Sequence, residues 1–362
     1  MKTASANCRL AIGPANFAGQ AFHWAEAVTR YLGVPATSFS NRASLLPHMG
    51  RVGFQFPVHH TLPHHRITSS WGRQVRMRRL LSGVTHLAID GFLPVYGRLD
   101  RSHVGEEFSR FQKMGLEVAL IAHGGDVRDP DSHMARYPFS YFRDAPPAWL
   151  ESLRSRSLIN RQTATNIGAP VFVSTPDLLL DLPTATWLPL AIDLGSWCSP
   201  RPPLTNRVPT FVHVPSRRDP PIKGTAVIDP ILRRMHEQGR IIYLSPERLP
   251  HAAMRLLIQA ADVVVDQILT GSYGVAAVEG MAAGRLVVGY IGEDVRNLMP
   301  ESPPIVDAEP SQFADVMERI LVEHELFAEQ ASMGPTYAQR WHGGLSSARV
   351  LGQFLGLGSR AW

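Results

Sequence analysis

The 362-residue chain has little cysteine, little lysine and no long hydrophobic run, and each shortage excludes a class of protein. Its two cysteines, Cys8 and Cys198, are too few for a disulfide scaffold or a thiolate zinc site. No stretch of about 18 apolar residues runs uninterrupted, so we expect no membrane-spanning helix. The first residues, MKTASANCRLAIG, contain no apolar stretch long enough for a secretion signal. These shortages predict a soluble, cytoplasmic protein of enzyme size.

Lysine is rare although the chain is basic. The formal net charge is +5, and among 36 lysines and arginines only Lys2, Lys113 and Lys223 are lysines. A positive balance suits anionic ligands such as phosphates, nucleic acid or acidic lipid head groups. No zinc finger, aromatic RNA-binding motif or lysine-rich tail accompanies it, so nucleic acid is not expected as a partner. A G-x-G-x-x-G fingerprint is also missing, which argues against a dehydrogenase.

Short apolar runs alternate with segments of helical period along most of the chain. The alternation begins with an expected strand at 10–13 and an expected helix at 21–32. Strands that are apolar throughout are buried on both faces, which is typical of a parallel sheet between helices. Proline and polar residues interrupt the alternation at 198–209, as in a linker. Because single cores stop growing near about 250–300 residues, we predict two α/β domains, 1–195 and 205–335, with ligand bound between them.

The sharpest signal is the segment ADVVVDQILTGSYGVAAVEGMAAGRLVVGYI at 261–291. Its pattern predicts a buried strand, a glycine-containing loop, a helix that begins near Gly274 and a second buried strand. At that helix N-terminus the amides of Tyr273, Gly274 and Val275 are expected to be unpaired, and with the helix dipole they make a site for a diphosphate. Glu279 lies about one turn further along, where its carboxylate can accept hydrogen bonds from two neighbouring hydroxyls.

This segment resembles the donor-binding motif of the retaining GT-B glycosyltransferases called glycosyl transferases group 1, or family 4. The family pattern E-G-F-G-x-x-x-x-E-A-M-A-x-G-x-P-V-V aligns with Gly271-Ser272-Tyr273-Gly274 and then with Glu279-Gly280-Met281-Ala282-Ala283-Gly284. The resemblance implies that Ser272 belongs to the donor site and that Glu279 holds the nucleotide ribose. The family's first glutamate, which contacts the donor sugar, is missing here because Gly271 stands in its place.

A second match supports the same family. The segment FVHVPSRRDPPIKGT at 211–225 is similar to the first strand and loop of the family's donor domain. There an arginine and a lysine five or six positions apart neutralise the leaving diphosphate, which matches Lys223 with either Arg218 or Arg217. Fixed cations stabilise the negative charge that builds on a departing phosphate. The resemblance makes Lys223 and Arg218 catalytic candidates and leaves the choice between the two arginines open.

The N-terminal half contributes further candidates. The stretch GPANFAG, which begins at Gly13 and ends at Gly19, matches the family's N-terminal glycine-rich loop beside the donor phosphates and the acceptor. His123 ends a buried strand and is similar to the histidine that the family places near the 6-position of the donor sugar, which makes it a catalytic candidate. A structural histidine is the alternative. Asp126 and Arg128 are expected to form a local ion pair, and contact with a ligand is the alternative.

Two other patterns suggest secondary roles. His59, His60, His64 and His65 are adjacent in pairs, so their side chains point apart in an extended chain, and no Cys, Asp or Glu joins them. We expect no metal there, and the stretch is a candidate for a pH-sensitive loop or for acceptor contacts. The segment 70–83 places several arginines on an expected helix, which resembles the basic amphipathic helix by which some relatives attach to acidic membranes. A solvated or acceptor-facing helix is the alternative.

Together the motifs imply an α/β protein of GT-B fold, with two Rossmann-like domains facing across a cleft. Its C-terminal helix, about 340–362, is expected to cross back to the N-terminal domain. The expected function is a retaining glycosyltransferase that uses a nucleotide-diphosphate sugar and neither a metal nor another cofactor. Contacts to the nucleotide base are expected near Arg248 and Leu249.

The acceptor is expected on the N-terminal domain, and its identity is left open with a preference for cell-envelope or specialised-metabolite biosynthesis. The location is expected to be the cytoplasm, including peripheral contact with the inner membrane face through 70–83. Two alternatives remain. A nucleotide-sugar-binding sensor is favoured by the missing first glutamate, and a nucleotide-sugar 2-epimerase would need further carboxylates near the sugar.

Overall fold

The first of two sheets is formed by residues between 10 and 187. The structure is a computed structural model that describes residues 8–41, 56–62, 70–96, 103–215, 217–247 and 249–358. The strands of the first sheet are β1 Leu10–Gly13, β2 Ala36–Asn41, β3 His60–Leu62, β4 His86–Asp90, β5 Glu117–Ala122, β6 Val171–Val173 and β7 Thr186–Trp187. They pair in the order β3-β2-β1-β4-β5-β6-β7, all parallel. The order reverses between β1 and β4, which is where such sheets bind ligands.

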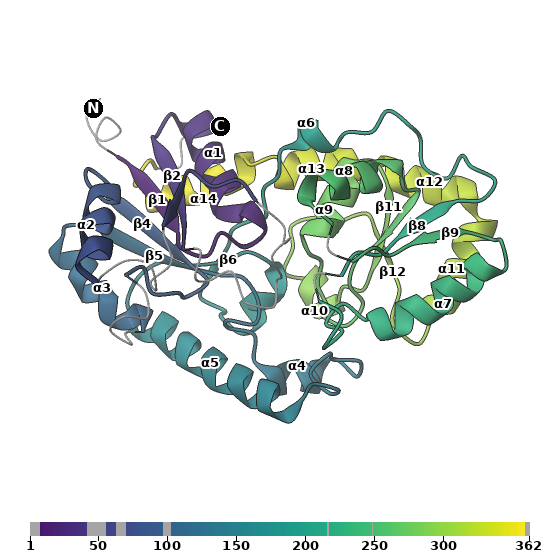
Figure 1. The fold of residues 1–362 in the computed structure, drawn as a ribbon, viewed down its shortest axis with the longest axis horizontal. Helices are drawn as coiled ribbons and strands as arrows, with labels where there is room; N and C mark the ends of the chain where they lie inside the picture. The colour runs from purple at the N-terminus through teal and green to yellow at the C-terminus, as the bar shows by residue number, and fades with distance from the viewer. Residues whose placement is uncertain are drawn as a thin grey trace.

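The second sheet is formed by residues between 210 and 307. Its strands are β8 Thr210–Val212, β9 Ile242–Leu244, β10 Val263–Val265, β11 Leu286–Gly289 and β12 Ile305–Asp307. They are parallel in the order β12-β11-β10-β8-β9, so the order reverses between β8 and β10. The two sheets lie next to one another in the molecule (Figure 1).

Helices connect the strands in both halves. Before the second sheet these are η1 Phe17–Gly19, α1 Gln20–Leu32, α2 Ser70–Leu80, α3 Val104–Lys113, α4 Pro130–Arg136, α5 Pro147–Asn166, η4 Pro176–Leu180 and α6 Leu194–Trp197. Within and after the second sheet these are α7 Thr225–Glu237, α8 His251–Ala260, α9 Val275–Ala282, α10 Glu293–Arg296, α11 Phe313–Val322, α12 His324–Ser332, α13 Gly334–His342 and α14 Leu345–Phe354. Among the described residues, no helix is both long and apolar enough to cross a membrane.

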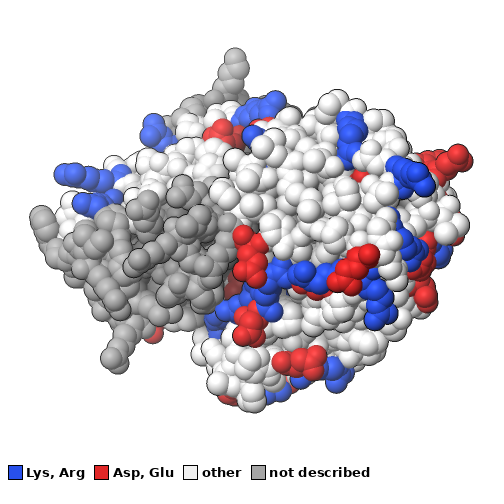
Figure 2. Space-filling view, turned by 45° about the vertical axis from the view of Figure 1, so that its right-hand side comes forward, with Lys and Arg blue, Asp and Glu red and all other residues white. Residues whose placement is uncertain are grey.

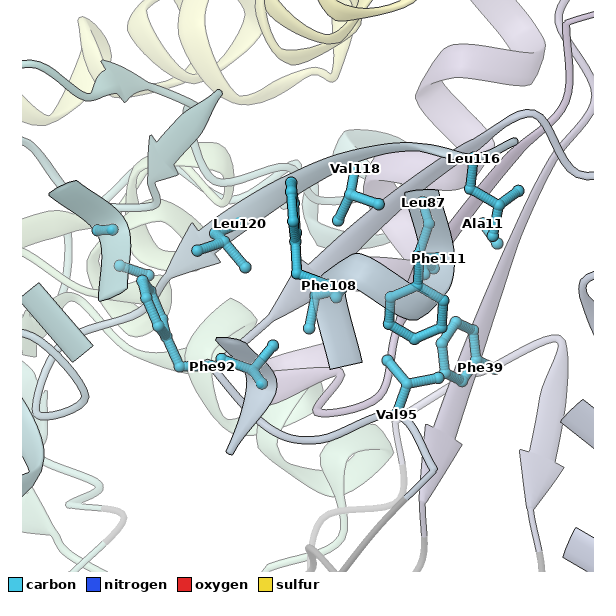
Figure 3. Packing of buried hydrophobic residues seen from close by; sticks show 14 of the residues in the cluster. Ala11, Phe39, Leu87, Phe92, Val95, Phe108, Phe111, Leu116, Val118 and Leu120 are labelled. Atoms are coloured by element: carbon cyan, nitrogen blue, oxygen red, sulfur yellow. The ribbon is translucent and has the colours of Figure 1, made fainter. Parts of the chain in front are cut away.

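Each sheet is covered by a hydrophobic cluster on either face. In β1, Ala11 joins the cluster that contains Phe39 and Phe111, whereas Leu10 joins the cluster around Trp24 on the opposite face. Figure 3 shows members of the first of these clusters. Two further clusters cover the second sheet in the same way. Strands that are apolar on both faces therefore form buried parallel sheets, as their sequence pattern predicts.

The last two helices join the two halves of the molecule. α13 lies against α9, where a Cβ on Gly334 would come within 2.8 Å of the Met281 carbonyl oxygen. α14 lies against α1 of the first half (Figure 1), and Ser347 Oγ donates to the carbonyl of Pro189 at 2.8 Å. The predicted return of the C-terminal helix is thus confirmed, although the chain breaks into two helices before Leu345. The bounds predicted for the two domains stay a prediction.

Candidate functional site

The loops that follow β8 and β10 meet at the C-terminal edge of the second sheet. Lys223 lies just before α7, and its carbonyl accepts a hydrogen bond from Ile268 N at 3.1 Å. Its Nζ donates to Oδ1 of Asp266 at 2.7 Å. The other oxygen of that carboxylate, Oδ2, accepts from Gly274 N at 2.8 Å. Asp266 therefore joins the Lys223 ammonium to the N-terminus of α9.

The set of unpaired amides predicted at the start of α9 needs a correction. Sequence reasoning left the amides of Tyr273, Gly274 and Val275 free, whereas the Gly274 amide is bound to Asp266. A carboxylate is favoured at this place by the helix dipole and by charge-assisted hydrogen bonds. Asp266 is only 2% exposed, so it needs such partners. Sequence reasoning missed Asp266, although a lone carboxylate directly after an apolar strand was a signal for it.

The side chains around Gly274 mostly point away from this edge. Ser272 is buried, and its carbonyl accepts from Gln267 Nε2 at 2.7 Å. The Tyr273 hydroxyl lies 3.3 Å from Nε2 of His342 at the end of α13. Val275 packs against the hydrophobic cluster of the second half. Of these predicted residues, Tyr273 and Val275 can therefore reach a ligand only through their backbone.

Glu279 lies on α9 and is 6% exposed. Its Oε1 is 3.2 Å from Nε2 of His251, the first residue of α8. Burial raises the pKa of the Glu279 carboxyl, while the hydrogen bond to His251 lowers it. His251 was not predicted, although it follows the two residues expected near the base. Of these, Leu249 packs partly buried against the cluster of the second half, and Arg248 lies outside the described residues.

Arg217 and Arg218 face different surroundings. The Arg218 guanidinium donates to Asp229 Oδ2 at 2.9 Å and to Ser245 Oγ at 2.6 Å, which ties it to α7 and to the end of β9. The Arg217 guanidinium carbon lies 5.7 Å from the centre of the Trp149 ring on α5. Arg218 is therefore held within the second half, whereas Arg217 lies against the first, and the choice between them stays open.

The glycine-rich loop of the first half is organised by Asp90, the last residue of β4. This buried carboxylate accepts hydrogen bonds from the amides of Ala15 at 2.6 Å and Asn16 at 2.7 Å. Gly13 ends β1 directly against β2, where a Cβ would lie 2.3 Å from the Phe39 carbonyl oxygen. The close approach of the two strands therefore requires glycine at position 13.

His123 follows β5 and lies above the same edge of the first sheet. Its ring stacks on Trp24 with centroids 5.6 Å apart, and Phe17 meets it edge-on at 5.2 Å. Nε2 is 3.6 Å from Asp90 Oδ2, which is too long for a hydrogen bond. This buried nitrogen has no hydrogen-bond partner among the described residues. Because buried polar atoms are normally paired, His123 Nε2 is suited to a ligand hydroxyl.

The ion pair predicted between Asp126 and Arg128 is wrong. The Asp126 carboxylate accepts from the amides of His123 at 2.9 Å and Gly124 at 2.7 Å, which closes the turn after β5. Arg128 is buried and donates instead to Asp177 at 2.5 Å. Asp126 follows too closely after the strand to turn towards Arg128, because the free amides at the strand end take its oxygens.

A chain of contacts brings candidates of the two halves together. Gly19 has a φ of +74° at the start of α1, and a Cβ on it would lie 3.3 Å from the Phe56 side chain. The Phe56 ring in turn lies 4.9 Å from the ring of His251, which contacts Glu279. The predicted loop residue Gly19 and the predicted ribose ligand Glu279 are thus separated by two aromatic side chains.

Tyr137 explains why residue 271 is a glycine. Tyr137 follows α4 in the first half, and its hydroxyl donates to Asp294 Oδ1 at 2.8 Å in the second half. A Cβ on Gly271 would lie 2.5 Å from Cζ of the Tyr137 ring, and Gly271 has a φ of +65°. A Cβ on Gly292 would also collide with this ring, at 2.7 Å. Tyr137 therefore fills the direction in which the family's first glutamate would extend.

A cavity of about 780 Å³ opens between α1, α6 and α8, next to His251. Its lining includes His23, Asp193, Trp197 and Arg255. Burial lowers the pKa of His23 to about 4, so its imidazole is uncharged at neutral pH. The volume is in the range of small-molecule sites, about 300–1,000 Å³. His251, which contacts Glu279, lines this cavity, so the cavity lies next to the candidate donor site.

The histidine-rich stretch shows no metal site in the part that the structure describes. His59 Nε2 lies 3.0 Å from Oε1 of Glu26 on α1. His64 and His65 lie outside the described residues. Within the described ranges, no group of three or more His, Cys, Asp or Glu side chains is placed to hold a metal ion.

The basic segment at 70–83 forms α2, whose apolar residue Met77 is fully buried in the cluster of the first half. Three of its arginines are exposed, Arg76, Arg78 and Arg79. Figure 2 shows that, on the face it presents, blue and red side chains lie next to one another and large areas carry neither. Contact of α2 with an acidic membrane stays a prediction.

Comparison with known proteins places the fold. No family model and no curated protein matches the chain. A sucrose-phosphate synthase from Thermosynechococcus elongatus is similar with a TM-score of 0.59 and 13% identity, over 97% of this chain and 98% of that one. The catalytic domain of starch synthase IV from Arabidopsis thaliana, bound to ADP and acarbose, has a TM-score of 0.59 and 11% identity, over 97% and 99%.

A third similar structure is a putative UDP-N-acetylglucosamine 2-epimerase from Listeria monocytogenes. Its TM-score is 0.53 at 11% identity, over 96% of this chain and 95% of that one. The likeness therefore extends over nearly the whole chain in all three cases, at identities that speak for the fold alone. Together with the two parallel sheets and the returning C-terminal helix, it shows that this chain has the GT-B fold.

Proposed function

We propose that this protein is a retaining glycosyltransferase that binds a nucleotide-diphosphate sugar at the C-terminal edge of its second sheet. One observation carries the proposal. The Lys223 ammonium and the Gly274 amide converge on a single buried anion, the Asp266 carboxylate, at the N-terminus of α9. An ammonium and a helix-start amide that bind one carboxylate are also the donors that a phosphate group needs.

The remaining candidates take roles around this anion site. Glu279 accepts the hydroxyls of the nucleotide ribose, and the base lies towards His251. Lys223, together with Arg217 or Arg218, stabilises the negative charge that builds on the leaving phosphate. His123 Nε2, which is buried and unpaired among the described residues, donates to a hydroxyl of the donor sugar.

Retention follows from the family resemblance of the donor motif. No side chain is needed as a base, because an oxygen of the leaving phosphate can take the proton of the acceptor hydroxyl on the same face of the sugar. The new glycosidic bond forms as the bond from the anomeric carbon to that phosphate breaks. The acceptor lies on the first half, beside the loop 13–19, and belongs to cell-envelope or specialised-metabolite biosynthesis.

The similar solved structures support a nucleotide ligand. The starch synthase IV domain is bound to ADP, and two of the three structures are named synthases of a sugar product. A sensor that binds a nucleotide sugar without transferring it is the second candidate. Tyr137 favours it, because this side chain fills the space next to Gly271 in which the family's sugar-contacting glutamate would lie.

The proposal is tested by thermal unfolding with UDP-, GDP-, ADP- and dTDP-sugars. A ligand that binds only the folded protein stabilises it by RT ln(1 + [L]/Kd), about 2.7 kcal/mol at a hundredfold excess over Kd. We expect one nucleotide family to raise the unfolding temperature of the wild type, and the shift to vanish in Glu279→Ala. The matched control Glu318→Ala removes an exposed carboxylate on α11 that pairs with Arg240, and it should keep the full shift.

The same samples separate the two candidate functions. A transferase releases nucleoside diphosphate when the stabilising donor is incubated with a panel of acceptors, whereas a sensor binds the donor and releases none. If no nucleotide sugar shifts the unfolding temperature of the wild type, the proposed donor site is wrong.

A further inference from the structure

Asp266 holds both donors of the proposed diphosphate site. Its carboxylate is 2% exposed, with Lys223 Nζ at 2.7 Å from Oδ1 and Gly274 N at 2.8 Å from Oδ2. Neither contact is needed to complete β10, which ends at Val265. A diphosphate that uses these two donors must therefore come close to a buried negative charge.

The charge of a diphosphate differs between donor and product. In a nucleotide sugar both phosphates are esterified and together carry about two negative charges. The terminal phosphate of the released nucleoside diphosphate gains a further negative charge with a pKa of about 6. Repulsion between like charges grows with each added charge and is strong in a partly buried site. Asp266 therefore disfavours binding of the nucleoside diphosphate more than binding of the nucleotide sugar.

The neighbouring groups show that this charge acts along the start of α9. Burial raises the pKa of the Glu279 carboxyl, and the charges of Lys223 and Asp266 shift it further in opposite directions, downward and upward. Lys223 and Asp266 thus form a nearly neutral pair beside the proposed ribose ligand. Lys223 attracts the extra negative charge of a nucleoside diphosphate and Asp266 repels it, so removal of the Asp266 charge alone should favour that ligand.

We propose that Asp266 is a specificity-determining residue that makes the site prefer the nucleotide sugar over the released nucleoside diphosphate. The inference rests on the proposed function. Before the donor binds, Asp266 holds Lys223 at the N-terminus of α9. After transfer it promotes release, because the terminal phosphate of the product competes with the Asp266 carboxylate for the Lys223 ammonium and the Gly274 amide.

The test compares the dissociation constants of the nucleotide sugar and its nucleoside diphosphate by calorimetry, in the wild type and in Asp266→Asn. Asparagine keeps the shape of the side chain and removes its charge. We expect the product to bind about tenfold more tightly in Asp266→Asn, with a smaller gain for the donor, so that the ratio of the two constants changes. In turnover, kcat falls together with KM because product release slows.

Asp262→Asn is the matched control. Asp262 precedes the same strand at its opposite end, is fully buried and pairs with Arg201 at 3.2 Å. This variant removes the same charge from the same strand, so it should lower stability and leave the donor-to-product ratio unchanged. A merely structural role of Asp266 predicts the same outcome for both variants.

A second measurement keeps the test decisive if Asp266→Asn does not fold. In the wild type, the methyl ester on the β-phosphate of the nucleoside diphosphate, which lacks the extra charge, should bind more tightly than the free nucleoside diphosphate. Tighter binding of the free diphosphate, or an unchanged ratio in a folded Asp266→Asn, overturns the inference and leaves the proposed function standing. Failure of the wild type to bind either ligand overturns both.

Discussion

Tyr137 reaches from the end of α4 to the second half and lies against two glycines of that half. Its hydroxyl donates to Asp294, and the space beyond the backbone of Gly271 and of Gly292 is filled by its ring. Burial and the bond to Asp294 raise the pKa of Tyr137, so its hydroxyl stays protonated and keeps donating. One aromatic side chain thereby determines which residues can stand at 271.

We predict that Gly271→Ala destabilises the fold more than a matched glycine change elsewhere. A left-handed φ costs an alanine roughly 1–2 kcal/mol, and the collision of its Cβ with Tyr137 adds about 1–3 kcal/mol. Gly239 has a φ of +71° with nothing within 4 Å of an added Cβ, so Gly239→Ala carries the first cost alone. Urea unfolding of both variants measures the difference.

The additional loss of stability in Gly271→Ala should disappear when the Tyr137 ring is also removed. In Tyr137→Ala, a second change of Gly271 to alanine is expected to cost no more than Gly239→Ala does. Equal losses for Gly271→Ala and Gly239→Ala in the otherwise unchanged protein would show that Tyr137 does not fill this space.

At the scale of elements, α13 connects the candidate site to the first half. His342 ends this helix and is fully buried, with Nδ1 2.8 Å from the Leu190 carbonyl and Nε2 3.3 Å from the Tyr273 hydroxyl. Burial lowers the pKa of His342 to about 4. The neutral ring therefore links the loop before α9 to the segment that leads out of the first sheet.

We predict that His342 makes the protein less stable in mild acid. Its pKa is about 4 in the folded state and about 6.5 when unfolded, so the unfolded chain binds more protons between these values. Stability is full above pH 6.5 and falls as the pH decreases towards 4, with a loss of about 2 kcal/mol at pH 5. Urea unfolding should therefore show that, between pH 8 and pH 5, the free energy of unfolding falls by about 2 kcal/mol less in His342→Asn than in the wild type. Equal losses of unfolding free energy in His342→Asn and in the wild type would contradict the lowered pKa of His342.

The sequence predicts those elements whose faces follow a simple apolar pattern. β10 is apolar throughout and β5 is apolar after Glu117, and both were expected as buried strands. α1 was expected from its helical period. α5 was missed although it is the longest helix described, because its buried face is made of residues such as Ser157 and Asn160. Such a face has no apolar period to detect.

The candidate site was predictable only where its residues belong to one local motif. Lys223, Gly274 and Glu279 stand in recognisable segments, so their elements follow from the sequence. Asp266 and Tyr137 act through partners that are distant in the chain, Lys223 and Asp294 among them. Pairing over such separations depends on how the sheet and the two halves assemble, which no local pattern contains.

At the scale of the whole molecule, the two halves meet on both sides of the candidate donor site. His133 Nε2 lies 3.1 Å from the Thr270 carbonyl on one side, and Phe56 meets His251 on the other. α13 and α14 connect the halves a third time (Figure 1). We expect these contacts to separate and re-form when the proposed donor enters, because a transferase site must exclude water during transfer.

The placement of the donor is tested most directly by the affinity of a nucleoside diphosphate for the wild type and for Lys223→Ala, measured by calorimetry beside the parent nucleoside. Hydrogen bonds to charged groups contribute about 1.5–3 kcal/mol, so we predict that Lys223→Ala weakens binding of the diphosphate at least about tenfold and leaves binding of the nucleoside unchanged. Lys113→Ala, which removes an exposed lysine on α3, should change neither. Equal affinity of Lys223→Ala and the wild type for the diphosphate would contradict the placement of the donor on this edge of the sheet.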